Sequence, residues 1–145
     1  MYLTKYPKYF NKLALDIGKA RSIISSQIYK NGTDKYRGNK EEEISTLGVL
    51  GELIVRHFFE ENKIKNIFNS IIDIKPIQDC DVITEQGRYD IKALKDTNQY
   101  FLVNEAAHNN KKKRELITHY LFVIIKTNNE ANIISFSKKE VDGWD

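Results

Sequence analysis

The spacing of apolar residues changes partway along this chain of 145 residues, and that change restricts the fold more than any other feature. From about residue 9 to 29, apolar residues recur every three or four positions, which predicts an amphipathic helix. The predicted inward stripe is Leu13, Ile17, Ala20, Ile24 and Ile28, with Lys12, Lys19 and Arg21 elsewhere on the helix. A second helix is predicted from about 41 to 62, with Leu47, Leu50, Ile54 and Phe58 in one stripe that Val55 and Phe59 widen.

After residue 62 the pattern favours strands, because short β-prone runs are separated by turn residues. The predicted strands are 67–74, 81–84, 88–94, 100–104, 120–126 and an edge-like one at 133–136, with a short helix within 105–118. Helices first and strands afterwards predict an α/β fold in which a central mixed sheet of four to five strands is flanked by helices. We expect a single domain over residues 1–145, with a helical extension at 1–36 and the core at 43–126.

Composition excludes several classes of protein. Hydrophobic residues make up 41% and charged residues 30%, as expected for a globular chain. Cys80 is the only cysteine, so neither an intramolecular disulfide nor a cysteine-based zinc site is predicted. Without a signal-like or membrane-length apolar run, the cytoplasm is the expected location, and without a Gly-rich phosphate loop no nucleotide cofactor is expected. The net charge of +3 is compatible with a nucleic-acid partner but does not require one.

The segment from Asp81 to Lys92 is predicted to form a β-hairpin around Glu85-Gln86-Gly87, in which Gly87 supplies the unusual backbone angles of the turn. Residues two apart in a strand share a face, so Asp90 and Lys92 lie together. Pairing across the hairpin about Gln86 is predicted to bring Asp81 roughly opposite Ile91, next to Asp90. Two carboxylates this close repel each other unless a cation lies between them.

Such a pair can bind Mg²⁺, for which Mn²⁺ can substitute, with the carbonyl oxygen of Ile91 as a further ligand. The metal would contact a phosphate oxygen and lower the pKa of an attacking water. Lys92 would orient that water or stabilise the charge that develops on the phosphate oxygens. Glu52 lies among apolar neighbours in the second helix, so its carboxylate needs a partner. The same metal is one candidate, and a lysine paired with Glu52 at the edge of the helix is the alternative.

The order of these acidic residues resembles that of the PD-(D/E)xK nuclease superfamily. It consists of Glu52 within Gly-Glu-Leu-Ile-Val, then Asp81, then Asp90-Ile91-Lys92. The resemblance implies a restriction-endonuclease-like core in which Asp81 is the first motif acid, Asp90 the second and Lys92 the motif lysine. Glu52 matches the helix glutamate of many members. No proline precedes Asp81, Asp79 competes for the role of first acid, and the second acid is Asp rather than the commoner Glu.

Cationic and polar residues outside the hairpin are candidates for phosphate contacts. They are Lys35 and Arg37, the run Lys111, Lys112, Lys113 and Arg114, and Asn104 and His108 after the predicted 100–104 strand. Two of these have a structural alternative: the run would be a solvated helix face, and His108 would be a surface histidine.

Together these features predict a Mg²⁺-dependent deoxyribonuclease, with an endonuclease favoured over an exonuclease, and a homodimer as a possible assembly. The alternative is a catalytically silent protein of the same fold that binds nucleic acid or inhibits a partner, for example a phage-encoded one. A third interpretation is an unrelated α/β interaction module that binds neither metal nor DNA.

Overall fold

The computed structural model of the chain describes residues 1–29, 39–68, 80–97, 101, 103, 108–109 and 117–144, with side chains for all of these except 25–29 and 39–41. Its elements are β1 (Tyr2–Lys5), α1 (Tyr9–Tyr29), α2 (Asn39–Glu61), β2 (Asn66–Phe68), β3 (Val82–Thr84), β4 (Gly87–Lys95), β5 (His119–Ile125), β6 (Glu130–Ser137) and α5 (Lys138–Asp142). The two helices predicted from the apolar spacing are therefore both present, with boundaries within two residues of the predicted ones.

The described strands form one mixed sheet of six strands in the order β1-β6-β5-β4-β3-β2. Every neighbouring pair is antiparallel except β4 and β5, which run parallel with Asp90 opposite Tyr120. The α/β class and the mixed sheet are confirmed, and the sheet has more strands than the four to five predicted.

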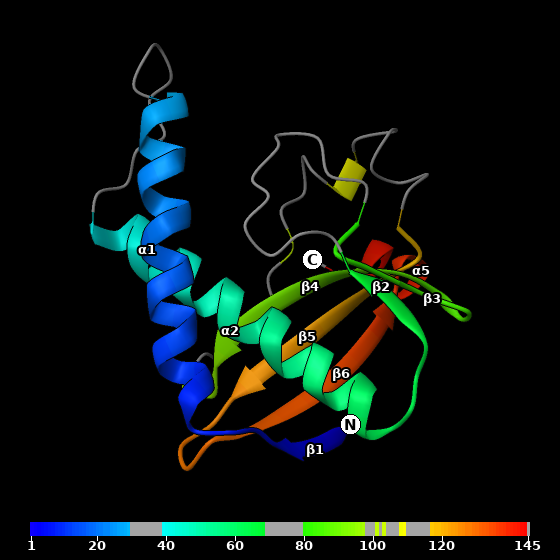
Figure 1. The fold of residues 1–145 in the computed structure, drawn as a ribbon. Helices are drawn as coiled ribbons and strands as arrows, with labels where there is room; N and C mark the ends of the chain where they lie inside the picture. Colours follow the sequence, from blue (N-terminus) through cyan, green and yellow to red (C-terminus); the bar gives the residue numbers. More distant parts are fainter. Residues whose placement is uncertain are drawn as a thin grey trace.

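Helix α2 lies across one face of the sheet, and α1 packs beside α2 (Figure 1). Val49, Ile54 and Val55 of α2 are fully buried against Leu121 and Val123 of β5. Gly51 sets the closeness of this contact, because a Cβ added there would lie 2.7 Å from the Cβ of Ala93 in β4. Gly48 has no described atom within 4 Å of such a Cβ, so close packing accounts for only one of the two helix glycines.

The buried face of α1 differs from the predicted one. Ala14, Gly18 and Ser22 are buried, whereas Leu13 is 38% exposed and Ala20 is exposed. A Cβ on Gly18 would lie 2.5 Å from the Thr46 hydroxyl oxygen, so small side chains at four-residue spacing bring the two helix backbones close together. This rotation of α1 turns Arg21 toward α2, although the apolar spacing had placed it on another side.

The opposite face of the sheet carries a second core. Side chains alternate along β5, so that Tyr120 and Phe122 point away from α2 while Leu121 and Val123 point toward it. Val141 of α5 and Trp144 pack on this second face. The ring of Phe101 also packs here, 4.8 Å from the ring of Phe122 between centroids.

Several predicted features are corrected by the structure. Strand β6 is not at the edge, because β1 pairs with it and takes the edge position; residues 1–36 therefore begin with a strand rather than a helix. In the predicted strand at 100–104, the two described residues, Phe101 and Val103, are not in strand conformation.

The role predicted for Gly87 is also wrong. The turn between β3 and β4 consists of Glu85 and Gln86, and Gly87 already pairs with Thr84 without a positive φ. A side chain at Gly87 would instead collide with the hydroxyl of Thr118 at the start of β5. Within the residues that the structure describes, no helix is long and apolar enough to cross a membrane.

Candidate functional site

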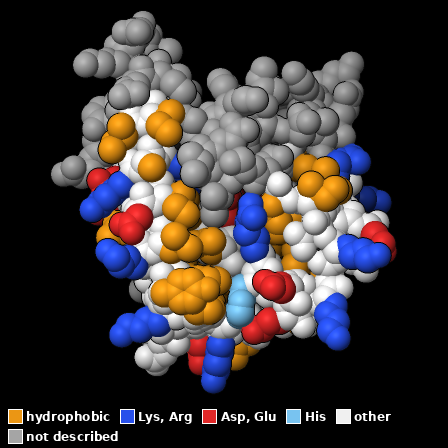
Figure 2. Space-filling view, in the orientation of Figure 1, with side chains coloured by type: hydrophobic (Ala, Val, Ile, Leu, Met, Phe, Trp, Pro, Cys, Tyr) orange, Lys and Arg blue, Asp and Glu red, His pale blue; other side chains and the backbone are white. Residues whose placement is uncertain are grey.

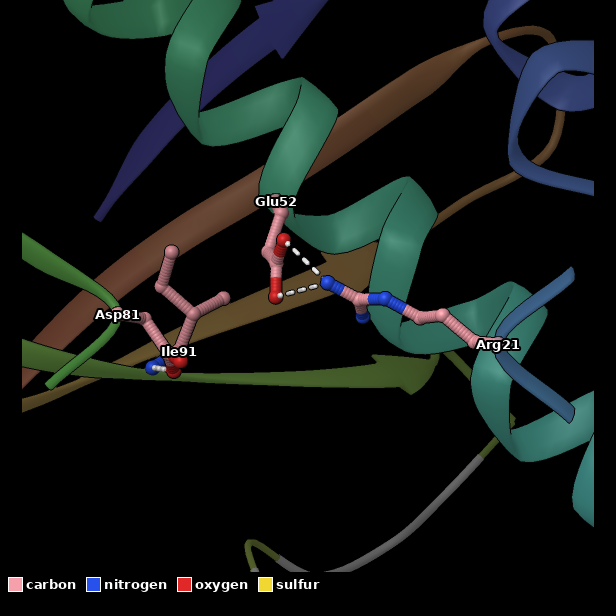
Figure 3. A network of polar contacts seen from close by, with 4 residues as sticks. All are labelled: Arg21, Glu52, Asp81 and Ile91. Atoms are coloured by element: carbon pink, nitrogen blue, oxygen red, sulfur yellow. Dashed lines mark hydrogen bonds and ion pairs between the residues drawn. The ribbon is translucent and has the colours of Figure 1, made fainter. Parts of the chain in front are cut away.

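The hairpin of β3 and β4 brings Asp81 to the end of strand β3, beside the middle of β4. Val82 of β3 pairs with Tyr89 of β4. Asp81, the residue before Val82, donates its N–H to the Tyr89 carbonyl oxygen at 2.9 Å. The Ile91 N–H donates to Asp81 Oδ2 at 2.7 Å. The Asp81 carboxylate is thus held by the backbone of the strand that carries the second acid, as Figure 3 shows.

Asp90 and Lys92 lie on the same face of β4, as their two-residue spacing predicts. Lys92 Nζ is 2.9 Å from Asp90 Oδ2. The Asp90 side chain is only 9% exposed, whereas Lys92 is 32% exposed, so the ammonium lies between a buried carboxylate and solvent. The prediction that Asp81, Asp90 and Lys92 come together in the hairpin is therefore confirmed.

Burial raises the pKa of Asp81 to about 7, and the negative charge of Asp90 acts in the same direction. The hydrogen bond from the Ile91 N–H opposes this rise, because it favours the ionised form. The two carboxyl groups are within hydrogen-bonding reach of each other, which also favours a proton on Asp81. Below about pH 7 the Asp81 carboxyl group therefore carries a proton.

Glu52 of α2 has a partner that sequence reasoning did not find. Arg21 Nη2 lies 3.2 Å from Glu52 Oε2 and 3.5 Å from Oε1, and the two side chains are 14% and 16% exposed. In Figure 3 Glu52 reaches from α2 toward β4, and Arg21 reaches the same carboxylate from α1. A buried carboxylate among apolar groups does need a partner, and in this structure the partner is a guanidinium.

Glu52 is close enough to both hairpin acids to affect them electrostatically. Burial raises the pKa of Glu52 and Asp90 adds to the rise, while Arg21 and then Arg56 oppose it. Burial lowers the pKa of Arg56, whose guanidinium carbon lies 4.2 Å from the centroid of the Phe68 ring. The site thus joins acids of α2 and of the hairpin to cations of α1, α2 and β4.

Arg21 and Arg56 carry no motif that would have identified them. Arg21 is 31 positions before Glu52, and its contact depends on the small-residue packing of α1 against α2. The available signal was Ala14-x-x-x-Gly18-x-x-x-Ser22, which marks a close helix contact and places position 21 at its border.

The predicted nucleic-acid contacts fall mostly outside the described residues. These contacts are Lys35, Arg37, Asn104, Lys111, Lys112, Lys113 and Arg114. Asp79, the competing candidate for the first acid, also lies outside the described residues. His108 is described and is 7% exposed. Its Nδ1 lies 2.6 Å from the Tyr120 hydroxyl and its Nε2 lies 2.6 Å from Asp142 Oδ1, so a phosphate contact from His108 would require it to leave at least one of these partners.

Two hollows on the described surface lie away from Glu52, Asp81 and Asp90. One, of about 480 Å³, lies between the two long helices and includes Leu15, Leu47 and Lys95 in its lining. Another, of about 440 Å³, is lined by Tyr2, Phe58 and other residues around the end of α2. On the face shown in Figure 2, hydrophobic side chains gather along α1 between cationic and acidic ones.

Among the described residues, no three His, Cys, Asp or Glu side chains stand close enough together to hold a metal ion as they are. The Asp81–Asp90 pair nonetheless fits a divalent cation, because its two neighbouring carboxyl groups hold a proton that such a cation can replace. Magnesium is commonly held by one or two carboxylates and several waters.

No family model matches the sequence, and no curated protein and no solved structure matches this chain.

Proposed function

We propose that this protein is a metal-dependent nuclease that hydrolyses phosphodiester bonds of DNA. The observation that carries the proposal is the meeting of Asp81, Asp90 and Lys92 in one hairpin, with Glu52 close enough to affect both acids. A mixed sheet flanked by helices, with acids on paired antiparallel strands, is also the arrangement implied by the resemblance to PD-(D/E)xK nucleases.

Asp81 and Asp90 would hold the metal ion, with the Ile91 carbonyl oxygen and Glu52 as further ligands. When bound, Mg²⁺ supplies a water of lowered pKa and neutralises charge on the phosphate. The Ile91 N–H keeps one oxygen of Asp81 in a fixed direction, since it donates to Oδ2 at 2.7 Å. This backbone contact orients the first acid before any ligand arrives.

Lys92 would act on the phosphate side of the site. Its ammonium group lies 2.9 Å from the buried Asp90 carboxylate and is partly exposed, so it can donate to a water or a phosphate oxygen while it keeps that contact. A lysine at this point stabilises the negative charge that develops as the water attacks phosphorus.

One observation favours the catalytically silent alternative. The acids already have partners within the protein: Asp90 pairs with Lys92, Glu52 pairs with Arg21, and Asp81 accepts a hydrogen bond from the Ile91 N–H. Each of these contacts is made without a metal ion. In that case the fold would bind nucleic acid or a protein partner without cleaving it.

Cleavage of labelled linear, circular, single-stranded and branched DNA, with Mg²⁺ or Mn²⁺ and with EDTA, tests the proposal. We expect metal-dependent cleavage by the wild type and a loss of at least about 100-fold in Asp90→Asn and Lys92→Ala. Asp96→Asn and Lys95→Ala are matched controls, because both side chains are exposed near the end of β4 and should leave cleavage unchanged.

Cleavage of circular DNA would identify an endonuclease, and size-exclusion chromatography would test the predicted homodimer. Normal cleavage by Lys92→Ala would exclude the mechanism. Salt-sensitive DNA binding without cleavage of any substrate would support the silent alternative.

A further inference from the structure

Arg21 makes an incomplete contact with Glu52. Only Nη2 of the guanidinium approaches the carboxylate, at 3.2 Å and 3.5 Å from its two oxygens. Its Nε is buried and has no hydrogen-bond acceptor among the described residues. A guanidinium pairs most strongly with a carboxylate through two parallel N–H groups, so this pair is weaker than its burial would allow.

When Asp81 is ionised, the charges around the site balance without a metal ion. The three acids and three cations that interact there are Glu52, Asp81, Asp90, Arg21, Arg56 and Lys92. A divalent cation on these acids would leave an excess of positive charge in a part-buried place, which is unfavourable unless an anion enters with it. A phosphate group of the substrate is such an anion.

We propose that Arg21 is an exchangeable partner of Glu52: it holds this carboxylate in the metal-free protein and turns to a substrate phosphate when a metal ion takes Glu52. The inference rests on the proposed nuclease function and extends it. Arg21 would then bind the DNA backbone on the side of the site that faces α1.

Arginine suits this exchange better than lysine. Its planar fork can pair with a carboxylate or with a phosphate in similar geometry, and it stays charged in both states. Arg21 extends from α1, whereas Glu52 extends from α2, so the pair also links the helix outside the hairpin to the acids.

Two measurements on Arg21→Gln separate exchange from a purely structural role. If Arg21 competes with the metal for Glu52, then Mn²⁺ should bind Arg21→Gln about three- to tenfold more tightly than wild type in calorimetry of EDTA-stripped protein. At saturating Mn²⁺, DNA cleavage should nevertheless be at least about tenfold slower, because the phosphate contact is lost. A structural role would weaken both properties.

The matched control is Lys12→Gln, which removes one cation from the same helix at an 84% exposed position and should change neither quantity. In a Glu52→Gln background, Arg21→Gln should no longer tighten Mn²⁺ binding, because the shared carboxylate is absent. Arg21→Lys keeps the positive charge, so it can be tested if Arg21→Gln fails to fold. It should bind Mn²⁺ somewhat more tightly than wild type and still cleave more slowly.

Equal or weaker Mn²⁺ binding by Arg21→Gln and Arg21→Lys, in proteins with a cooperative melting transition, would overturn the exchange while leaving the nuclease proposal intact. Absence of Mn²⁺ binding and of cleavage in the wild type would overturn the nuclease proposal itself.

Discussion

The Asp81 carboxyl group is protonated in the folded protein at a pH at which an exposed aspartate is fully ionised. Burial and the neighbouring Asp90 raise its pKa to about 7, and only the Ile91 N–H opposes them. In the unfolded chain the same group has its ordinary pKa, near 3.8. Folding is therefore linked to proton uptake at this position.

The sign of this linkage leads to a prediction. The pKa of Asp81 is higher in the folded protein than in the unfolded chain. Protonation of Asp81 therefore contributes fully to the free energy of unfolding below about pH 4, and this contribution is lost as the pH rises toward about 7. Asp81→Asn keeps the shape of the protonated acid and does not titrate. In EDTA we expect it to match wild type near pH 4 and to exceed it near pH 8, by no more than about 4 kcal/mol.

Urea denaturation of both proteins at several pH values would measure this difference. Mg²⁺ should reduce this difference near pH 8, because only the wild type can bind it with the ionised pair. A constant difference across the pH range would show that Asp81 does not hold the proton.

At the scale of residues, the hairpin acids were predictable and their cationic partners were not. The positions of Asp81, Asp90 and Lys92 follow from local alternation and a short turn, which depend on neighbouring residues alone. The Arg21–Glu52 pair depends on how one helix rotates against another, which the spacing of large apolar residues predicted incorrectly. The phosphate contacts predicted for residues outside the described ranges stay predictions.

Gly51 allows helix α2 to lie close to strand β4, because glycine has no side chain. A Cβ at Gly51 would lie 2.7 Å from Ala93 Cβ, so the helix would have to move away from the strand. Glu52 is the next residue, and any such movement changes its approach to Arg21 and to the hairpin. The contact of helix and strand thus also sets the geometry of the acids.

We therefore expect Gly51→Ala to destabilise the protein. Overpacking costs about 1–3 kcal/mol, and the improved helix propensity returns only about 0.5–1 kcal/mol. Gly48→Ala is the matched control, because no described atom lies within 4 Å of its added Cβ; it should stabilise the protein by about 0.5–1 kcal/mol. Thermal unfolding of the two variants beside wild type would measure both effects, and equal effects would contradict the close contact.

At the scale of elements, helix positions were predictable because their periodicity extends over twenty residues or more. The order of the strands in the sheet was harder to predict from the sequence. Tyr2–Lys5 is only four residues long, and nothing local indicates that it pairs with β6 and displaces it from the edge. Short edge strands are determined by tertiary contacts rather than by their own sequence.

The described part of the molecule has two hydrophobic cores, one on each face of the sheet, and strand β5 contributes to both. Leu121 and Val123 belong to the core under the helices, while Tyr120 and Phe122 belong to the other. Because β5 carries side chains of both cores, loss of either core removes packing contacts from this strand.

Coincident unfolding of the two faces is the expected result. The single tryptophan, Trp144, packs on the face away from α2, so its fluorescence reports on that core. Far-ultraviolet circular dichroism is dominated by α1 and α2, which cover the other face. Both signals should show the same urea midpoint if the molecule unfolds as one unit. Separate midpoints would mean that the two cores unfold independently.

The pairing of β1 with β6 also determines when the sheet can be completed during synthesis. Among the described strands, β1 leaves the ribosome first and β6 leaves last, yet the two are neighbours. Until β6 emerges, the backbone groups of Tyr2–Lys5 lack the strand with which they pair in the finished sheet. The sheet can therefore close only after translation has passed Ser137, through a contact between distant parts of the chain that is intrinsically slow to form.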